Sequence, residues 1–255
     1  LHLSIRRQRQ MCIRDSRNME MLYEMPEPRL VKNRVYDLPL RTSALRTLGA
    51  YGNVFANESM INELAESANL DPFTFRLEHL KDERAIAVLS KLQQVMEDNS
   101  GDGEQYGQGI GFARYKNSAA YCAIGVSLSV NEAAEVKLHD AYIVCDAGEI
   151  VDSEGVRAQL EGGFIQAASW TLYEQVLYER DGIISRDWDT YPIITFDKHG
   201  TSGKPFHVGR DPKVIWYAYD AADTPLNETA AKLDGHWVML VYDCLLYTSP
   251  SPRDS

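Results

Sequence analysis

The segment from Arg41 to Ser59, RTSALRTLGAYGNVFANES, joins an arginine and two glycines to the start of a periodic apolar run. Gly49 and Gly52 allow the backbone to approach a ligand closely or to adopt positive φ, and Arg46 offers a rigid fork of donors. The run predicts a helix from about Asn53, whose unpaired N–H groups suit phosphate or oxo ligands. These residue types indicate an anion-binding site, and the same pattern also suits a plain helix entry.

A second group of polar residues lies further along the chain. The hydrophobic period predicts a helix over residues 153–179, in which Gln159 and Glu161 interrupt a small or apolar face. A buried amide and a buried carboxylate must find partners, and contact with a ligand is one way to supply them. A structural clamp at the end of a helix is an equal alternative for Glu161. Asp146 and Asp152 flank an AGEIV turn, and we interpret both as turn formers.

Helices and strands around these residues follow from the period of the apolar positions. After the first helix, Asp71 and Pro72 are typical of the cap and first position of a second one, and a third helix is expected over residues 84–97. The period then changes to two, which predicts paired strands at 121–130 and 136–146. The fold class is therefore α+β, with helices followed by an antiparallel strand pair and a long helix.

The stretch from Asp98 to Gly111, DNSGDGEQYGQGIG, is interpreted as a linker because it is rich in glycine and charge and nearly devoid of apolar residues. Its GQGIGF sequence has the glycine content of a nucleotide loop, but no strand, turn and helix surround it. The adjacent RYKN at 114–117 is basic and aromatic. This segment contributes only two cations, and the chain as a whole is acidic. A structural role at a strand edge is therefore favoured over RNA binding.

Composition limits the partners. The chain has 255 residues and a net charge of −11, which argues against nucleic acid or an anionic membrane surface. Cys122 and Cys145 stand among apolar or small residues and are expected to be buried thiols; no CxxC or other metal spacing occurs, so no iron–sulfur cluster or zinc is expected in this chain. No apolar run approaches the roughly 20 residues of a membrane-spanning helix.

The segment at 41–59 resembles the cofactor loop of the molybdenum hydroxylases, the xanthine dehydrogenase and aldehyde oxidase family. The form is that of the molybdopterin-binding large subunits of bacterial nicotinate and isoquinoline oxidoreductases, which read RxLGAYxNVFAxES. Three further blocks resemble the same subunit in the same order: GFARYKNSAAYC at 111–122, AGEIVDSEGVRAQLEGGFIQAASW at 147–170, and SRDWDTYPI from Ser185. The resemblance extends from Tyr36 to Phe196.

The resemblance implies a partial molybdopterin-binding domain that holds a molybdopterin dinucleotide, in the cytosine form. The positions that match the cofactor contacts of the family are Arg46, Thr47, Gly49 and Gln159. Relatives commonly place an aromatic residue that stacks on the substrate where this chain has Leu48. We therefore expect Leu48 and Tyr51 to shape the substrate pocket, with Tyr51 as its aromatic member.

The resemblance also implies an activity: oxidation of an aldehyde or an N-heteroaromatic compound with oxygen derived from water. Electrons would pass to an iron–sulfur small subunit that carries [2Fe–2S] clusters, and from there to a cytochrome or flavin subunit. The base in the family is a glutamate in a GE motif, but Gly203-Lys204-Pro205-Phe206 stands where relatives read GEPFLG and no second GE follows. No catalytic residue is therefore assigned in this chain.

The two ends resemble something other than protein. RRQRQMCIRDS at 6–16 and CLLYTSPSPRDS at 244–255 are similar to translated transposase adapters from DNA sequencing libraries, so we expect both ends to be non-native. The expected divisions are an adapter (1–16), a cofactor-loop and helical segment (17–98), a linker (99–111), an α+β segment (112–196), a doubtful segment (197–243) and a second adapter (244–255).

We interpret the doubtful segment as a reading-frame slip or chimeric join near Asp197, with genuine divergence as the alternative. The chain is then expected to be a fragment that is inactive alone and whose compartment, cytoplasmic or periplasmic, stays open. The alternative hypothesis belongs to a different class of function: the chain is a non-catalytic module that binds an anion or a nucleotide. That alternative would be favoured if Arg46, Gly49 and Gln159 lay far apart in space.

Overall fold

The computed structural model describes residues 16–33, 40, 45–98, 107–132, 136–194 and 214–218. The described helices are α2 (Ala50–Ser67), α3 (Pro72–Glu78), α4 (Glu83–Asp98) and α5 (Ser153–Leu172), with a short 3-10 turn, η1 (Tyr115–Asn117). The strands are β1 (Gly107–Arg114), β2 (Tyr121–Val130), β3 (Val136–Asp146), β4 (Tyr178–Glu179), β5 (Gly182–Ile183) and β6 (Val214–Ala218). The expected α+β class is confirmed.

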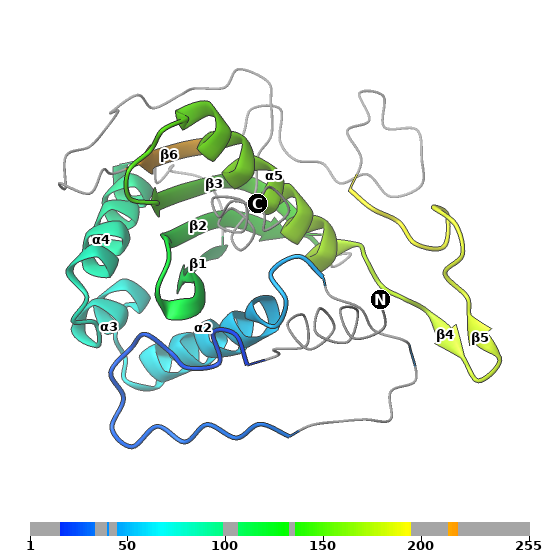
Figure 1. The fold of residues 1–255 in the computed structure, drawn as a ribbon, viewed down its shortest axis with the longest axis horizontal. Helices are drawn as coiled ribbons and strands as arrows, with labels where there is room; N and C mark the ends of the chain where they lie inside the picture. Colours follow the sequence, from blue (N-terminus) through cyan, green and yellow to red (C-terminus); the bar gives the residue numbers. More distant parts are fainter. Residues whose placement is uncertain are drawn as a thin grey trace, which may run out of the picture.

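A four-stranded sheet in the order β1-β2-β3-β6 forms the middle layer (Figure 1). β1, β2 and β3 pair antiparallel, and β6 lies parallel to β3. Because side chains alternate along a strand, the two faces of the sheet bury different residues. Ala123 and Val144 pack against the helices α2 to α4 on one face, whereas Ile124 and Ile143 pack against Leu160 of α5 on the other. The sheet thus has α5 on one side and α2, α3 and α4 on the other.

Local signals predict the second helix and the strand pair correctly. The Asp71 side chain accepts hydrogen bonds from the backbone N–H groups of Phe73 and Thr74, and Pro72 occupies the first position of α3. β2 and β3 have the predicted bounds and pair antiparallel, with one irregularity in register beside Ser127. The third helix, α4, spans one residue more at each end than the expected 84–97.

Three boundaries differ from the expectations. α2 begins at Ala50 rather than Asn53, because Gly49 already has helical angles, with φ −73°. Residues 107–111 of the expected linker belong to β1, whose backbone pairs with β2 despite the glycines that hide its alternation. α5 ends at Leu172 rather than 179, because the chain turns into the β4–β5 hairpin, where Gly182 has a φ of +140°.

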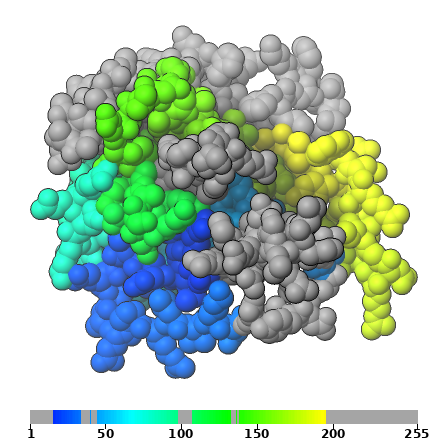
Figure 2. Space-filling model, viewed as in Figure 1, coloured from blue at the N-terminus to red at the C-terminus, as the bar shows by residue number. Residues whose placement is uncertain are grey.

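The hairpin segment after α5 lies along one edge of the molecule and is open to solvent (Figure 2). Trp188 is 74% exposed there. None of the helices within the described residues is both long and apolar enough to cross a membrane. The expected adapters, apart from Ser16, and the GKPF segment at 203–206 lie outside the described residues, as does the doubtful segment apart from β6. Residues 99–106 of the expected linker also lie outside them.

Gly125, in the middle of β2, leaves space for a helix side chain. A Cβ at this position would lie 2.0 Å from Sδ of Met96 on α4. Gly125→Ala is therefore expected to lower the free energy of unfolding by about 1–3 kcal/mol, as overpacking does in other cores. Urea denaturation of Gly125→Ala, Met96→Ala and the double variant measures the coupling. The alanine should cost less in the Met96→Ala background, and an equal cost in both backgrounds would contradict the prediction.

The expectation of two buried thiols is confirmed. Cys122 and Cys145 are each 1% exposed and face each other across β2 and β3, in the cluster that packs under α5. In a Cys12→Ser, Cys244→Ser variant, neither thiol should react with Ellman's reagent in the native state, and both should react in denaturant. Absorbance at the thionitrobenzoate band follows the reaction. Release of colour without denaturant, as fast as for an exposed cysteine, would contradict the burial of the pair.

Candidate cofactor-binding site

The turn before α2 lies against α5, although more than a hundred residues separate the two in the chain. The Arg46 guanidinium donates from Nη2 to Oε1 of Gln159 at 3.1 Å and from Nη1 to Oε1 of Gln166, also at 3.1 Å. Both glutamines lie on α5, seven residues apart, which places them on one face of the helix. The structure therefore brings together two of the predicted cofactor contacts, Arg46 and Gln159, and adds a third residue that the sequence analysis did not single out.

Thr47 is strained and its hydroxyl is unsatisfied. Its φ is +70° and that of Leu48 is +58°, a left-handed conformation that is unfavourable for residues with a Cβ, most of all a β-branched one. Of the two uses of glycine considered for Gly49, positive φ does not occur, since its φ is −73° and the two residues before it have positive φ instead; a close approach to a ligand stays a prediction. Thr47 is 1% exposed, and its Oγ1 has no hydrogen-bond partner among the described residues. A buried hydroxyl without a partner costs free energy, so this conformation suits a residue that meets a ligand.

The N-terminal end of α2 follows this strained turn directly. Gly49 is the N-cap residue and gives no side-chain cap, and the first turn of this 18-residue helix contains no acidic residue. The partial positive charge of the helix start is thus not offset by a carboxylate in that turn. A Cβ built at Gly52 meets no protein atom within 4 Å, and a close approach of its backbone to a ligand stays a prediction.

Tyr51 connects α2 to the C-terminal end of α5. Its ring meets Trp170 edge to face, with centroids 5.2 Å apart, and its hydroxyl lies 3.0 Å from Oγ1 of Thr171. Leu48, the other residue expected to shape a substrate pocket, is partly exposed in the turn before the helix. The two residues lie on the same turn and helix start as Arg46, and their role toward a substrate stays a prediction.

Other polar residues have structural partners. Glu161 accepts a hydrogen bond at 2.7 Å from Nε of Arg157, one turn earlier on α5. This pair lies within one helix and is not a clamp between a helix and a loop, so both interpretations of Glu161 stay predictions. Asp152 caps α5 by accepting from the Gly155 N–H. Asp146 accepts from the Gly148 N–H, as a turn former does, and also forms a two-point ion pair with Arg84. Sequence reasoning missed that ion pair.

At the end of β1, the RYKN segment has the structural role that was expected at a strand edge. Arg114 lies over the Tyr121 ring, with Cζ 4.7 Å from the centroid, and forms an ion pair with Asp82. The Lys116 N–H donates to Asn18. These contacts hold the η1 turn against the helices and the N-terminal segment, so the segment needs no ligand to account for its charge.

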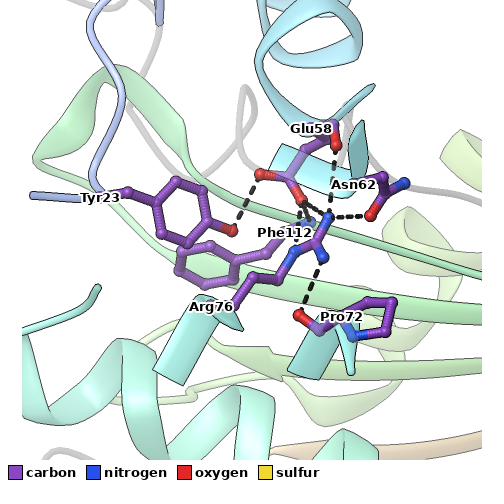
Figure 3. A network of polar contacts seen from close by, with 6 residues as sticks. All are labelled: Tyr23, Glu58, Asn62, Pro72, Arg76 and Phe112. Carbon is purple, nitrogen blue, oxygen red and sulfur yellow. Dashed lines mark hydrogen bonds and ion pairs between the residues drawn. The ribbon is translucent and has the colours of Figure 1, made fainter. Parts of the chain in front are cut away.

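A buried polar network lies between α2, α3 and β1, away from the turn at Arg46 (Figure 3). Glu58 accepts hydrogen bonds from Arg76, from the Tyr23 hydroxyl at 2.9 Å and from the Phe112 backbone N–H at 2.9 Å. Arg76 also donates to the side chain of Asn62 and to the carbonyl of Pro72. A hollow lined by Tyr23, Glu58 and Phe112, among others, borders this network.

Burial determines the titration behaviour of this network. It raises the pKa of Glu58, and Arg76 opposes that rise; it also raises the pKa of Tyr23 well above the ordinary value. A signal for the network existed in the sequence, because Glu58 lies four residues after Val54 and three before Ile61, on the apolar face of its helix. The network is a structural centre, since each member is satisfied by protein partners.

A ligand with phosphate or oxo groups fits the turn at Arg46. The guanidinium is held by two amides, the Thr47 hydroxyl is buried without a partner among the described residues, and the uncapped start of α2 follows. Within the described part of the chain, no group of three or more His, Cys, Asp or Glu side chains is arranged to hold a metal ion. The donor set therefore suits the anionic part of a larger group.

Comparisons with known proteins agree with this chemistry. The family model of the molybdopterin cofactor-binding domain matches residues 53–199. The chain is 35% identical over 190 residues to a nicotinate dehydrogenase subunit of Pseudomonas putida, covering 68% of this chain and 16% of that protein. It is 28% identical over 179 residues to the beta subunit of isoquinoline 1-oxidoreductase of Brevundimonas diminuta, covering 62% of this chain and 22% of that protein.

Among solved structures, quinoline 2-oxidoreductase from Pseudomonas putida 86 matches 44% of this chain and 14% of its own, at 19% identity and a TM-score of 0.33. The chain thus spans less than a quarter of the length of the curated relatives it matches. The family model covers more than half of the chain. The resemblance to the molybdenum hydroxylases is confirmed, and the chain belongs to the molybdopterin cofactor-binding domain family.

Proposed function

We propose that this chain is part of the large subunit of a molybdenum hydroxylase, and that it holds one side of a molybdopterin dinucleotide. The observation that carries the proposal is the hydrogen bonding of Arg46 to Gln159 across two distant segments, beside the unsatisfied Thr47 hydroxyl. Both segments belong to blocks that resemble the family, and Gln159 also lies within the residues that the family model matches. Had Arg46 and Gln159 been far apart, the simpler anion- or nucleotide-binding module would have been favoured.

In this proposal Arg46, Thr47, Gly49 and Gln159 bind and orient the cofactor. Arg46 offers its positive charge to the anionic groups, Thr47 offers its hydroxyl, and Gly49 lets the helix start approach without a side chain between. Gln159 both holds Arg46 and has an amide N–H₂ group for the cofactor. When bound, the molybdenum cofactor supplies the redox chemistry of the hydroxylation, with the new oxygen taken from water.

The substrate in this proposal is a small N-heteroaromatic compound or an aldehyde. The names of the relatives, a nicotinate dehydrogenase and an isoquinoline oxidoreductase, favour the N-heteroaromatic class. Leu48 and Tyr51 would contact the aromatic ring of the substrate. The orientation of the Tyr51 side chain is fixed by its contacts with Trp170 and Thr171. The family's base, a glutamate, would come from sequence other than the described residues, so this chain alone orients the cofactor without completing the reaction.

The partners follow from the same comparison. Both curated relatives are named as subunits, which supports an assembly of more than one chain. We propose an iron–sulfur small subunit with [2Fe–2S] clusters as the first electron acceptor, and a cytochrome or flavin subunit after it. The cytosine form of the dinucleotide and a cytoplasmic or periplasmic location belong to the same proposal.

The test begins with the source DNA, read across both ends of the native segment to a natural stop. The complete large subunit, purified with its small subunit, should hold one molybdenum per chain and release CMP on acid denaturation. It should oxidise nicotinate or isoquinoline faster than benzaldehyde and take the product oxygen from labelled water. The 255-residue chain alone should hold no stoichiometric molybdenum and show no turnover.

Three outcomes would contradict the proposal. Release of a nucleotide other than CMP would refute the cytosine form, and a complete subunit that binds nucleotide without molybdenum would favour the binding-module alternative. A reading frame that continues through the present tail, with no GE motif, would remove the base and also favour that alternative.

A further inference from the structure

We propose that residues 174–194, here named the arm, form a docking element that packs into the part of the large subunit lying outside this chain. This inference rests on the proposed function and extends it from the cofactor to the assembly of the subunit. The arm follows α5 and contains the β4–β5 hairpin, which stands away from the four-stranded sheet (Figure 1).

The arm exposes large apolar side chains and has no core of its own. All of residues 174–194 are described by the structure, and none of them is buried. Exposed apolar or aromatic side chains follow one another along the hairpin and the turn after it. Those that are between 41% and 74% exposed are Val176, Leu177, Tyr178, Ile183, Ile184 and Trp188. Single exposed apolar residues are common on protein surfaces, whereas a contiguous group marks a site of contact with another part of a protein.

The hairpin is apolar on both of its faces. Tyr178 lies opposite Ile183 in the register of β4 and β5. The Ile184 N–H donates to the Leu177 carbonyl at 2.8 Å, so these two residues continue the ribbon by one step. Because successive side chains of a strand point to opposite faces, the Leu177 and Ile184 side chains lie on the face opposite to Tyr178 and Ile183. A ribbon that is apolar on both faces fits between two layers of protein better than on a single surface.

Hydrogen bonds within the arm hold its shape. The Leu177 N–H donates to Oγ of Ser185 at 2.9 Å, and Oδ1 of Asp187 accepts from the Thr190 N–H at 3.0 Å. A two-stranded hairpin by itself is only marginally stable in water, so its apolar side chains need a partner. A segment that is already ordered loses less conformational entropy when it docks. The arm therefore has the properties of a preformed docking element.

The base of the arm is tied to α5. Oγ of Ser169, which lies on α5, accepts from the Ile194 N–H at 3.0 Å, and the Tyr191 hydroxyl donates to Oε2 of Glu174 at 2.7 Å. Both ends of the arm are thus held at the C-terminal end of the helix that carries Gln159. Docking of the arm would fix this helix relative to the rest of the subunit.

The remainder of the large subunit is the occupant that the comparisons favour. The chain covers 16% of the nicotinate dehydrogenase subunit and 22% of the isoquinoline 1-oxidoreductase subunit, so most of a subunit of that length lies outside it. The family model extends to residue 199 and includes the whole arm, so the arm is part of the family domain. A membrane surface is a poor alternative, because Glu179 and Asp181 lie at the tip of the hairpin and the chain is acidic.

The test measures the accessibility of the arm with a thiol reporter. Trp188→Cys places the reporter on the arm, and Ser90→Cys, on the exposed side of α4, is the control. Labelling by iodoacetamide is followed by mass spectrometry of the peptide around each position, in the 255-residue chain and in the complete large subunit purified without its small subunit. Position 188 should react in the 255-residue chain nearly as fast as in urea, and at least about a hundredfold more slowly in the complete subunit. Position 90 should react at similar rates in both proteins.

The molybdenum and CMP contents of the same complete subunit test the proposed function separately. Equal labelling of position 188 in both proteins, with molybdenum retained, would overturn the docking role and leave the proposed function intact. A protected arm in a complete subunit that holds no molybdenum would support the docking role and overturn the cofactor-binding role.

Other occupants of the arm give distinct results, and each of them overturns the inference. Protection that appears only after the small subunit is added would assign the arm to that partner. Protection in the 255-residue chain that rises with its concentration would assign the arm to a second copy. Protection of position 90 as strong as that of position 188 would show that the effect is not specific to the arm. If Trp188→Cys prevents the complete subunit from folding, Ile183→Cys replaces it as the reporter and the same results decide.

Discussion

Arg76→Met should lower the free energy of unfolding by about 3–5 kcal/mol, because it leaves the Glu58 carboxylate buried without its counter-ion. The Arg76 side chain is 0% exposed and that of Glu58 is 9% exposed, and they meet through Nη2 and Oε2 at 2.9 Å. Methionine fills part of the volume, so the loss reflects charge more than a cavity. Urea denaturation followed by circular dichroism measures it.

Two control variants separate the effect of the unpaired Glu58 charge on stability from the other effects of losing an arginine. Arg157→Met removes an arginine of α5 whose partners Glu154 and Glu161 are 79% and 25% exposed, and it should cost less than about 1 kcal/mol. Glu58→Met combined with Arg76→Met removes both charges and should cost less than Arg76→Met alone. If Arg76→Met proves no more damaging than Arg157→Met, the pair does not stabilise the fold as described.

The pH dependence has a definite sign. Burial raises the pKa of Glu58, and Arg76 is the main influence that opposes the rise, so its removal should raise that pKa further. A carboxyl group with a raised pKa in the folded state stabilises the fold below its unfolded pKa of about 4.3, and this stabilisation is lost as pH rises through the folded value. Relative to the unmodified chain, Arg76→Met should therefore recover stability as pH is lowered from 8 toward 5.

Elements with local signals were predictable from the sequence. Asp71 and Pro72 identify the start of α3 because a cap acts on the N–H groups two and three residues later. β2 could be predicted from the alternation in GVSLSV at its less buried end, although both faces of β2 and β3 contribute residues to the two buried clusters. The first part of β1 was not predicted as a strand, because Gly107, Gly109 and Gly111 have no side chains and the alternation of apolar residues is lost there.

The site was predictable only in part. Arg46 and Gln159 could be assigned because each matches a cofactor contact of the family. Gln166 lies in the same block as Gln159 but matches no such contact, and its hydrogen bond to Arg46 depends on how α5 meets the turn before α2. The strain also escaped prediction: glycine is the usual residue at positive φ, but here Thr47 and Leu48 adopt it. Contacts across more than a hundred residues are set by packing, which local propensity does not encode.

Arg46→Met should strongly reduce cofactor retention in the complete large subunit, and this is the largest functional effect that we predict. Hydrogen bonds from a charged donor contribute about 1.5–3 kcal/mol each, and each 1.4 kcal/mol corresponds to about tenfold in affinity. Loss of the guanidinium toward an anionic cofactor should therefore reduce molybdenum content and released CMP at least about tenfold. Metal analysis by mass spectrometry and nucleotide analysis after denaturation give the two values.

Arg46→Lys separates charge from direction. Lysine keeps the positive charge, but a single ammonium cannot reach Gln159 and Gln166 as the two ends of a fork do. Its cofactor content should therefore lie between those of Arg46→Met and the unmodified subunit, with an unchanged melting temperature of the cofactor-free protein. Full retention of molybdenum in Arg46→Met would mean that the anion is held elsewhere. Retention in Arg46→Lys equal to that of the unmodified subunit would mean that charge alone suffices and the two amides only pack.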